Sequence, residues 1–369
     1  MIARPAARCC AGLLVLGLAA GCNPAYLVQA AGGHWQLMTA RRPVAGVIAD
    51  PATAPVTRRR LEEATAAVAF AHSALALPDN GSYRDYVDIG RPYAVWNVFA
   101  AGPFDLALRR WCFPVAGCVV YRGYFDEQRA RDFAAQLAAG GDDVHVAGAV
   151  AYSTLGYLRD PLLSSVLQLP GATATALMFH ELAHQRVYIP GDTVFNESFA
   201  TLVEQEGLAR WLAARGEWAA LCRFGNGLAR ARQVRALLDE ARAELAAIYR
   251  SASPEVQPTA AKAAAFARLL ERYRALRAGW REPPYFDSWF EGDINNASLG
   301  ALAAYDRLVG VLRVILASEG GDLPAFYRRA DRLAQLDEAA RGEVLGAITA
   351  AYQHGPGNYC QARAAVPAG

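Results

Sequence analysis

His180-Glu181-Leu182-Ala183-His184 is the stretch that decides the fold and the chemistry of this chain. Histidines four positions apart lie on one face of a helix, one turn from each other, so both imidazoles can bind one metal ion. Glu181 lies beside them and can take a proton from a water that the metal activates. Residues 172–188 contain no proline or glycine, and Pro190-Gly191 follows them. We therefore expect a metal-binding helix that ends before this turn.

A third ligand follows after the turn. A second helical run contains Asn196-Glu197, with the small residue Ala200 one turn after the glutamate. Two helices joined by a tight turn would place this carboxylate against the two imidazoles. Two histidines and one glutamate leave a fourth tetrahedral position open, which is the pattern of a catalytic zinc site. The sequence therefore predicts one zinc ion per chain with Glu181 as the catalytic base, and the predicted zinc ligands are His180, His184 and Glu197.

The alternative without a metal is a buried histidine pair on a core helix, because so short a motif also arises by chance. The second helix argues against this alternative, since it supplies a carboxylate at the right distance along the chain. A structural zinc site is a further alternative. The acid between the two histidines argues against it, because a purely structural site has no use for Glu181.

Composition describes an ordinary globular protein with an ample core. The chain has 369 residues, of which 54% are hydrophobic and 20% are charged, and its net charge is +2. This size suits one large or two modest domains. The near-neutral charge argues against nucleic acid as a partner.

Residues 1–21 have the features of a bacterial lipoprotein signal peptide. Arg4 and Arg8 precede a short apolar run, and Leu18-Ala19-Ala20-Gly21 places small residues before Cys22. We expect Cys22 to become the lipid-modified first residue of an exported protein held on the membrane, on the periplasmic side of the cell envelope. A plain signal peptide cut near this position is the alternative.

The remaining cysteines agree with export, because an oxidising compartment permits disulfides. Cys112 and Cys118 lie close together in a segment that Pro114 and Gly117 could turn, so a local bridge is the preferred pairing. A Cys222–Cys360 disulfide is predicted only by elimination, because these two cysteines are the ones that remain.

The order of predicted elements indicates an α+β fold, with a small sheet in the N-terminal half and a mainly helical C-terminal half. The metal helices lie where the two halves meet, within a mature protein that comprises a mixed part, residues 22–159, and a helical part, residues 160–369. The predicted strands cover residues 93–99, 119–121 and 144–154. The predicted helices cover residues 25–42, 57–77, 126–139, 217–249, 259–280, 296–318 and 323–335.

Several ordered motifs resemble one known family. They are Trp111–Cys118, Tyr121–Phe125, Ala151–Gly156, Asp160–Leu163, His180–Gln185, Phe195–Ala200 and Asn295–Ala297. This set resembles the bacterial aminopeptidases of the zincin type, which are commonly lipoproteins and are related in site design to the gluzincins. The resemblance covers nearly all of the mature chain. It implies a zincin-like fold, a peptide substrate, zinc bound by His180, His184 and Glu197, and Glu181 as base.

The chain departs from this family pattern where a free amino terminus would be bound. Gluzincin aminopeptidases use a Gly-x-Met-Glu-Asn strand, whereas the corresponding stretch here, Gly148–Tyr152, has no acid. Glu206, Asp160 or Glu204 could bind the α-ammonium group instead. Glu204 lies seven residues after Glu197 on the same helical face, so it could equally orient a histidine.

An oxyanion donor is also expected, since peptide hydrolysis builds negative charge on the carbonyl oxygen. Tyr305 is the first candidate, against the alternative that its ring simply packs, and Tyr152 and Tyr157 follow. The main prediction is a zinc-dependent peptidase that acts as an aminopeptidase. The alternatives are a zinc endopeptidase and a lipid-anchored scaffold that binds zinc without cleaving anything.

Overall fold

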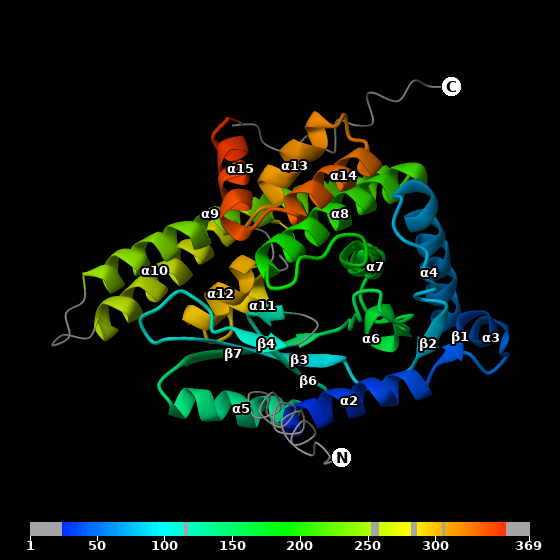
Figure 1. The fold of residues 1–369 in the computed structure, drawn as a ribbon, viewed down its shortest axis with the longest axis horizontal. Helices are drawn as coiled ribbons and strands as arrows, with labels where there is room; N and C mark the ends of the chain where they lie inside the picture. Colours follow the sequence, from blue (N-terminus) through cyan, green and yellow to red (C-terminus); the bar gives the residue numbers. More distant parts are fainter. Residues whose placement is uncertain (1–23, 114–116, 252–257, 282–285, 305–306, 352–369) are drawn as a thin grey trace, which may run out of the picture.

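A computed structural model describes residues 24–113, 117–251, 258–281, 286–304 and 307–351. Every described strand lies between residues 42 and 163, and the described chain beyond residue 163 contains only helices and their connections (Figure 1). The expected α+β composition is therefore found. None of the described helices is both long enough and apolar enough to cross a membrane. The predicted leader and Cys22 lie outside the described residues.

Strand β3 (Val95–Ala101) is the centre of the main sheet. It pairs in antiparallel fashion with β6 (Arg122–Tyr124) on one side and with β7 (Asp143–Ala149) on the other. Helix α5 (Glu127–Ala139) lies under this sheet and α12 (Asn296–Ala304) lies above it (Figure 1). Covering both faces explains why β3 is almost uniformly apolar, because neither of its faces meets water.

The two faces of β3 pack into different hydrophobic clusters, because successive side chains of a strand point to opposite faces of the sheet. Trp96 and Val98 pack with the small residues Ala130 and Ala134 of α5. Phe99 packs on the other side with the alanines of α12. The sheet is thus a thin layer fixed between two alanine-rich helices.

Two smaller sheets lie beside it. Strands β1 (Arg42–Pro43), β2 (Asp85–Val87) and β8 (Leu162–Leu163) form one of them. Hairpin β4 (Trp111–Phe113) and β5 (Gly117–Val119) form the other. A disulfide joins Cys112 and Cys118 across this hairpin, which confirms the local pairing. The second predicted pairing involves Cys360, which lies outside the described residues.

The helices form the rest of the molecule. Helices α9 (Trp218–Arg250) and α10 (Thr259–Ala278) form the predicted helical hairpin, on the left of Figure 1. The described helices not yet named are α2 (Pro24–Thr39), α3 (Val44–Ala49), α4 (Pro55–Ala74), α6 (Ser164–Leu167), α7 (Thr173–His184), α8 (Thr193–Ala214), α11 (Asp287–Phe290), α13 (Val309–Ser318), α14 (Leu323–Ala334) and α15 (Glu338–Ala351).

Some predicted elements are wrong in extent. Strand β7 ends at Ala149 instead of residue 154, because Ser165 donates a hydrogen bond to the next carbonyl, that of Val150, at 2.6 Å. The helix predicted over residues 296–318 is two helices, and the N–H of Leu308 in the break donates to Ser198 Oγ instead. The strand predicted at residues 119–121 is replaced by β5 and β6 on either side of Val120-Tyr121.

The largest core surrounds α7 and α8. Phe179 of α7 and Phe195 and Phe199 of α8 are completely buried, and the ring of Phe199 stacks on that of Phe326 in α14 at 5.6 Å. Gly207 lets the two helices approach, because a Cβ atom there would come within 2.8 Å of the Phe179 ring. This core holds the two helices that carry the predicted metal ligands.

Candidate metal centre

The side chains of His180, His184 and Glu197 converge in the buried space between α7 and α8. Glu197 Oε2 lies 3.3 Å from His180 Nε2 and 3.7 Å from His184 Nε2, and all the potential ligand atoms lie within 4.8 Å of one another. Zinc–ligand bonds of about 2.0–2.1 Å in a tetrahedron separate neighbouring ligand atoms by roughly 3.3–3.4 Å. The two distances to Glu197 are close to this spacing, so the three residues could hold a metal ion such as zinc, and the sequence had singled out the same three.

Local hydrogen bonds at the start of α8 fix the third ligand. Asp192 caps the helix by accepting from the N–H of Phe195 at 2.9 Å. Asn196, next to Glu197, exchanges two hydrogen bonds of 2.8 Å with the backbone of Ile189. These bonds hold the loop that joins α7 to α8 against the start of α8. Helix α7 itself ends at His184, four residues earlier than expected.

Glu204 holds one histidine in place. Its Oε2 lies 3.0 Å from His180 Nδ1, on the opposite side of the ring from Glu197. A carboxylate in this position fixes the tautomer and the orientation of a ligating imidazole. Of the two roles that the sequence left open for Glu204, the geometry is that of the orienting residue. The second histidine differs, because His184 Nδ1 is buried and has no hydrogen-bond partner among the described residues.

The charges of the cluster suit a cation. Burial alone would raise the pKa of Glu197, but the imidazole of His184 and hydrogen bonds with both histidines outweigh it and lower this pKa to about 2. Glu197 is therefore ionised at neutral pH, as a metal ligand must be. Burial also raises the pKa of Glu181, and the two imidazoles only partly oppose this rise.

Glu181 lines a small cavity next to the metal ligands. The wall of the cavity is mostly apolar and comes from α6, α7 and the segments that follow β7 and precede β8. Tyr83 and Tyr152 are its two aromatic residues. The other lining residues are Ala151, Pro161, Leu163, Val166, Leu177 and Met178. The Glu181 carboxylate therefore lies between the metal ligands and a small apolar cavity.

The other two acids considered for an α-ammonium group are already engaged. Asp160 is 2% exposed and accepts hydrogen bonds from the backbone and hydroxyl of Thr154 and from the hydroxyl of Ser153. Its backbone carbonyl accepts from the N–H of Tyr83 at 2.7 Å. Glu206 binds Arg210 one turn away at 2.8 Å. Both acids serve the fold, so neither offers a spare carboxylate.

Two tyrosines to which the sequence analysis assigned no role lie near the cluster. Burial raises the pKa of Tyr121, and the nearby charge of Glu197 raises it further. The ring of Tyr188 lies edge-on to that of His184, with centroids 6.4 Å apart. Tyr188 follows His184 by four residues, so helical spacing could have indicated it. The sequence offered Tyr121 only as the first residue of a family motif, without a role, and the fold brings it close to Glu197.

The tyrosines that the sequence proposed are less well supported. Tyr305 lies outside the described residues. Tyr157 is 73% exposed, and Tyr152 lines the cavity beside Glu181.

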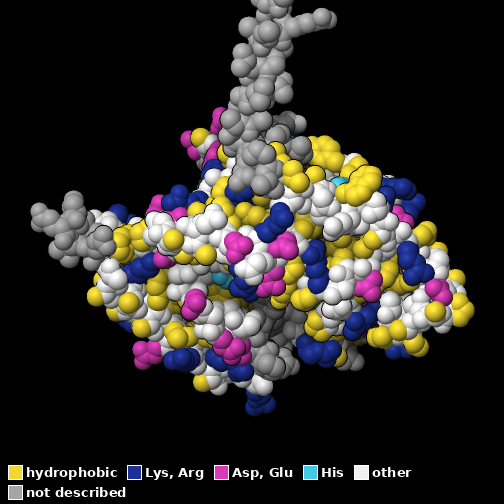
Figure 2. Space-filling view, turned by 90° about the horizontal axis from the view of Figure 1, so that it is seen from below, with side chains coloured by type: hydrophobic (Ala, Val, Ile, Leu, Met, Phe, Trp, Pro, Cys, Tyr) yellow, Lys and Arg dark blue, Asp and Glu magenta, His cyan; other side chains and the backbone are white. Residues whose placement is uncertain are grey.

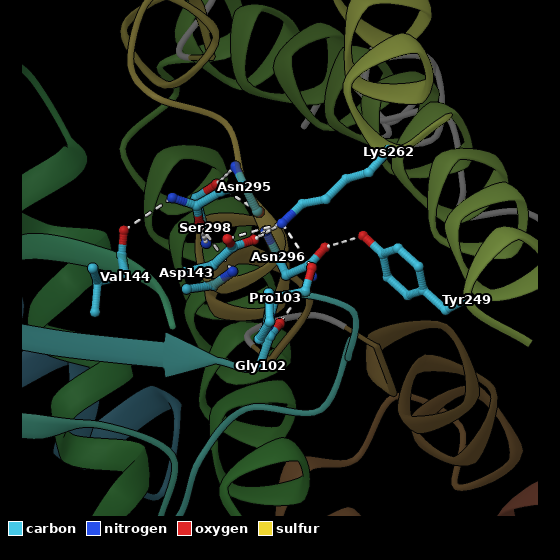
Figure 3. Close-up of polar contacts among 10 residues, drawn as sticks. Gly102, Pro103, Asp143, Val144, Tyr249, Lys262, Asn295, Asn296 and Ser298 are labelled. Atoms are coloured by element: carbon cyan, nitrogen blue, oxygen red, sulfur yellow. Dashed lines mark hydrogen bonds and ion pairs between the residues drawn. The ribbon is translucent and has the colours of Figure 1, made fainter. Parts of the chain in front are cut away.

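The motif Asn295-Asn296 contributes to a polar network that fastens α12 to the sheet (Figure 3). The side-chain amide of Asn296 donates to the carbonyls of Gly102 and Pro103, and its Oδ1 accepts from Tyr249. Asp143, at the start of β7, accepts from the backbone N–H of Asn296 at 2.8 Å. Lys262 of α10 donates to both oxygens of Asp143 at 2.8 and 2.7 Å and to the Pro103 carbonyl. This network connects α9, α10 and α12 to β3 and β7.

A protein-family model described as “Putative aminopeptidase” matches residues 25–345. The chain belongs to this family. The match includes α2 and extends into α15, so it spans both the sheet and the metal helices. Searches of curated proteins and of solved structures found no significant match.

Proposed function

We propose that this member of the aminopeptidase family is a zinc-dependent aminopeptidase of zincin-like fold that hydrolyses peptides with Glu181 as its general base. One observation carries the proposal. Three buried side chains that commonly bind zinc bring their ligand atoms within 4.8 Å of one another, and the half-buried carboxylate of Glu181 is adjacent in sequence to one of them. The family match supports a peptide substrate.

The residues have separate tasks in this reaction. His180, His184 and Glu197 would hold the zinc ion, and Glu204 would keep the first imidazole in orientation through Nδ1. A zinc ion in such a site polarises the substrate carbonyl and lowers the pKa of water. The Glu181 carboxylate accepts the proton from the attacking water and then delivers it to the leaving amine. Burial raises the pKa of Glu181, which makes it a stronger base.

Tyr121 is our candidate for the oxyanion donor. Its hydroxyl experiences the charges of both Glu197 and Glu181, which indicates that it lies near both carboxylates. Its raised pKa keeps the hydroxyl protonated at neutral pH, and only the protonated form can donate a hydrogen bond.

One observation favours an endopeptidase as the second candidate. Asp160, Glu204 and Glu206 all have partners in the fold, so none of these three is left to bind a free α-ammonium group. An enzyme without such a carboxylate has no reason to require a free amino terminus.

A mixed peptide library with free and N-acetylated termini tests the proposal. The purified protein loaded with zinc should cut the free peptides and remove one residue at a time. Equal cleavage of acetylated peptides would replace the aminopeptidase with the endopeptidase. Zinc binding without any cleavage would contradict the proposed function and favour the scaffold.

A further inference from the structure

Helix α2 is fixed on the protein by one of its faces. The side chain of Gln29 donates to the Gly123 carbonyl at 3.3 Å and accepts from the N–H of Phe125 at 3.1 Å. Gly33 lies so close to the Phe125 ring that an added Cβ would come within 2.1 Å of it. Leu37, one turn further on, is 5% exposed. These contacts determine which face of α2 points outward.

The outward face is apolar. Val28 is 71% exposed, Trp35 is 70% exposed and Leu27 is 42% exposed. Val28 and Trp35 are seven positions apart, with Ala31 exposed between them, so they share one stripe of the helix. Figure 2 views the molecule from the side on which α2 and α5 lie, and it shows hydrophobic side chains on this surface.

The composition of α2 is unusual for a helix with an exposed face. Its sixteen residues, Pro24–Thr39, contain no aspartate, glutamate, lysine or arginine. A helix that faces water normally carries charged residues on its outer side. A large exposed tryptophan on an uncharged helix suits the boundary between lipid headgroups and acyl chains, where Trp is enriched.

The position of α2 in the chain also indicates a lipid membrane as its partner. A single residue separates the predicted lipid-modified Cys22 from Pro24, the first residue of α2. A lipid at Cys22 would therefore bring the beginning of α2 to the membrane surface.

We propose that the outward face of α2 lies in the interface of the lipid bilayer, with Val28 and Trp35 inserted at the level of the headgroups. Amphipathic helices bind membranes in this way, lying in the plane of the interface. The membrane would then cover the lower edge of the molecule in Figure 1, along α2, and leave α13, α14 and α15 at the upper edge in water. This inference does not depend on the proposed peptidase activity.

Fluorescence quenching in vesicles tests this placement. The full-length protein, expressed so that its leader is processed, is mixed with vesicles of phosphatidylethanolamine and phosphatidylglycerol. Trp35→Phe isolates the emission of Trp35 as a difference from the wild-type spectrum. Brominated lipids should quench most of that difference, and iodide in the buffer should quench little of it. Trp218→Phe is the matched control, because Trp218 is partly exposed on α9 and its emission should be insensitive to brominated lipids.

Two results would overturn the proposal. Quenching of Trp35 by iodide but not by brominated lipids would place the residue in water. Protection of Trp35 from both quenchers would mean that protein, such as a second copy of the chain, covers α2.

Discussion

Two polar clusters of the described residues differ in whether their charges are paired within the protein. In the Lys262 cluster the charges are paired, because the ammonium group of Lys262 donates to both carboxylate oxygens of Asp143 (Figure 3). The side-chain amide of Asn296 is also satisfied, since its nitrogen donates to the Gly102 carbonyl and its oxygen accepts from Tyr249. Between α7 and α8, two imidazoles and a carboxylate turn their ligand atoms towards one point. No lysine or arginine forms an ion pair with Glu197 among the described residues.

The difference separates a structural cluster from a functional one. A charge removed from water is costly unless it is paired, so the pairing of Lys262 with Asp143 supports the stability of the fold. The α7–α8 cluster consists of potential metal ligands without a lysine or arginine partner among the described residues, so it suits a bound metal ion. Changes at the Lys262 cluster should therefore affect folding, and changes at the α7–α8 cluster should affect metal binding and turnover.

The largest expected effect is that of Glu181→Gln. The amide is isosteric with the carboxylate but cannot accept the proton of the attacking water. Loss of a general base lowers turnover by about 10²–10⁴-fold. Steady-state kinetics on a peptide that the wild type cleaves would measure this loss, with zinc content and melting temperature unchanged. Full turnover in this variant would assign the base to another residue.

Tyr121→Phe should have the next largest effect. Removing one oxyanion donor lowers kcat by about 10²–10³-fold. The ring remains to pack against Phe99, so stability should change little. Tyr188→Phe is the informative companion variant, because Tyr188 also lies close to the metal ligands. If Tyr188→Phe loses kcat and Tyr121→Phe does not, the donor is Tyr188.

Lys262→Met removes the ion pair with Asp143 and should lower the free energy of unfolding. Removing one partner of a buried ion pair costs about 3–5 kcal/mol, and we expect about 3 kcal/mol because both side chains retain slight exposure. Urea unfolding measures this cost, while zinc content and kcat of the folded protein should stay at their wild-type values. Arg268→Met is the control, since its ion pair with Glu244 is exposed and should contribute less than about 1 kcal/mol. Equal destabilisation by both variants would contradict the structural role of Lys262.

Glu204→Gln should have the smallest effect of the four. Loss of a carboxylate that orients a ligating histidine weakens metal affinity by about 10–100-fold. Competition with a zinc chelator measures the change. Glu206→Gln, two residues further along α8 and bound to Arg210, should leave the affinity unaltered. An unaltered affinity in Glu204→Gln would remove the orienting role.

Local spacing predicted much of the metal cluster, because helical periodicity places His180, His184 and Glu204 from their positions in the chain. The same spacing could have indicated Tyr188. Contacts between distant segments were not predictable in this way. The sheet brings Tyr121 to Glu197, and the Lys262 cluster joins residues that are far apart in the chain.

The errors in element length have the same cause. Strand β7 stops next to Val150, whose carbonyl accepts from Ser165, and the loop after α7 is held by Asn196 at the backbone of Ile189. Both are tertiary hydrogen bonds that compete with the continuation of a strand or a helix. Patterns of apolar residues contain no information about them.

Metal analysis of the wild type beside His180→Ala and His184→Ala tests the central claim most directly. Elemental analysis of the protein after exhaustive dialysis against zinc-free buffer gives the number of zinc ions per chain. We predict one equivalent in the wild type and well below one in each variant, because a site with three protein ligands cannot spare one. One full equivalent in both variants, or none in the wild type, would contradict the assignment of His180, His184 and Glu197 as a zinc site.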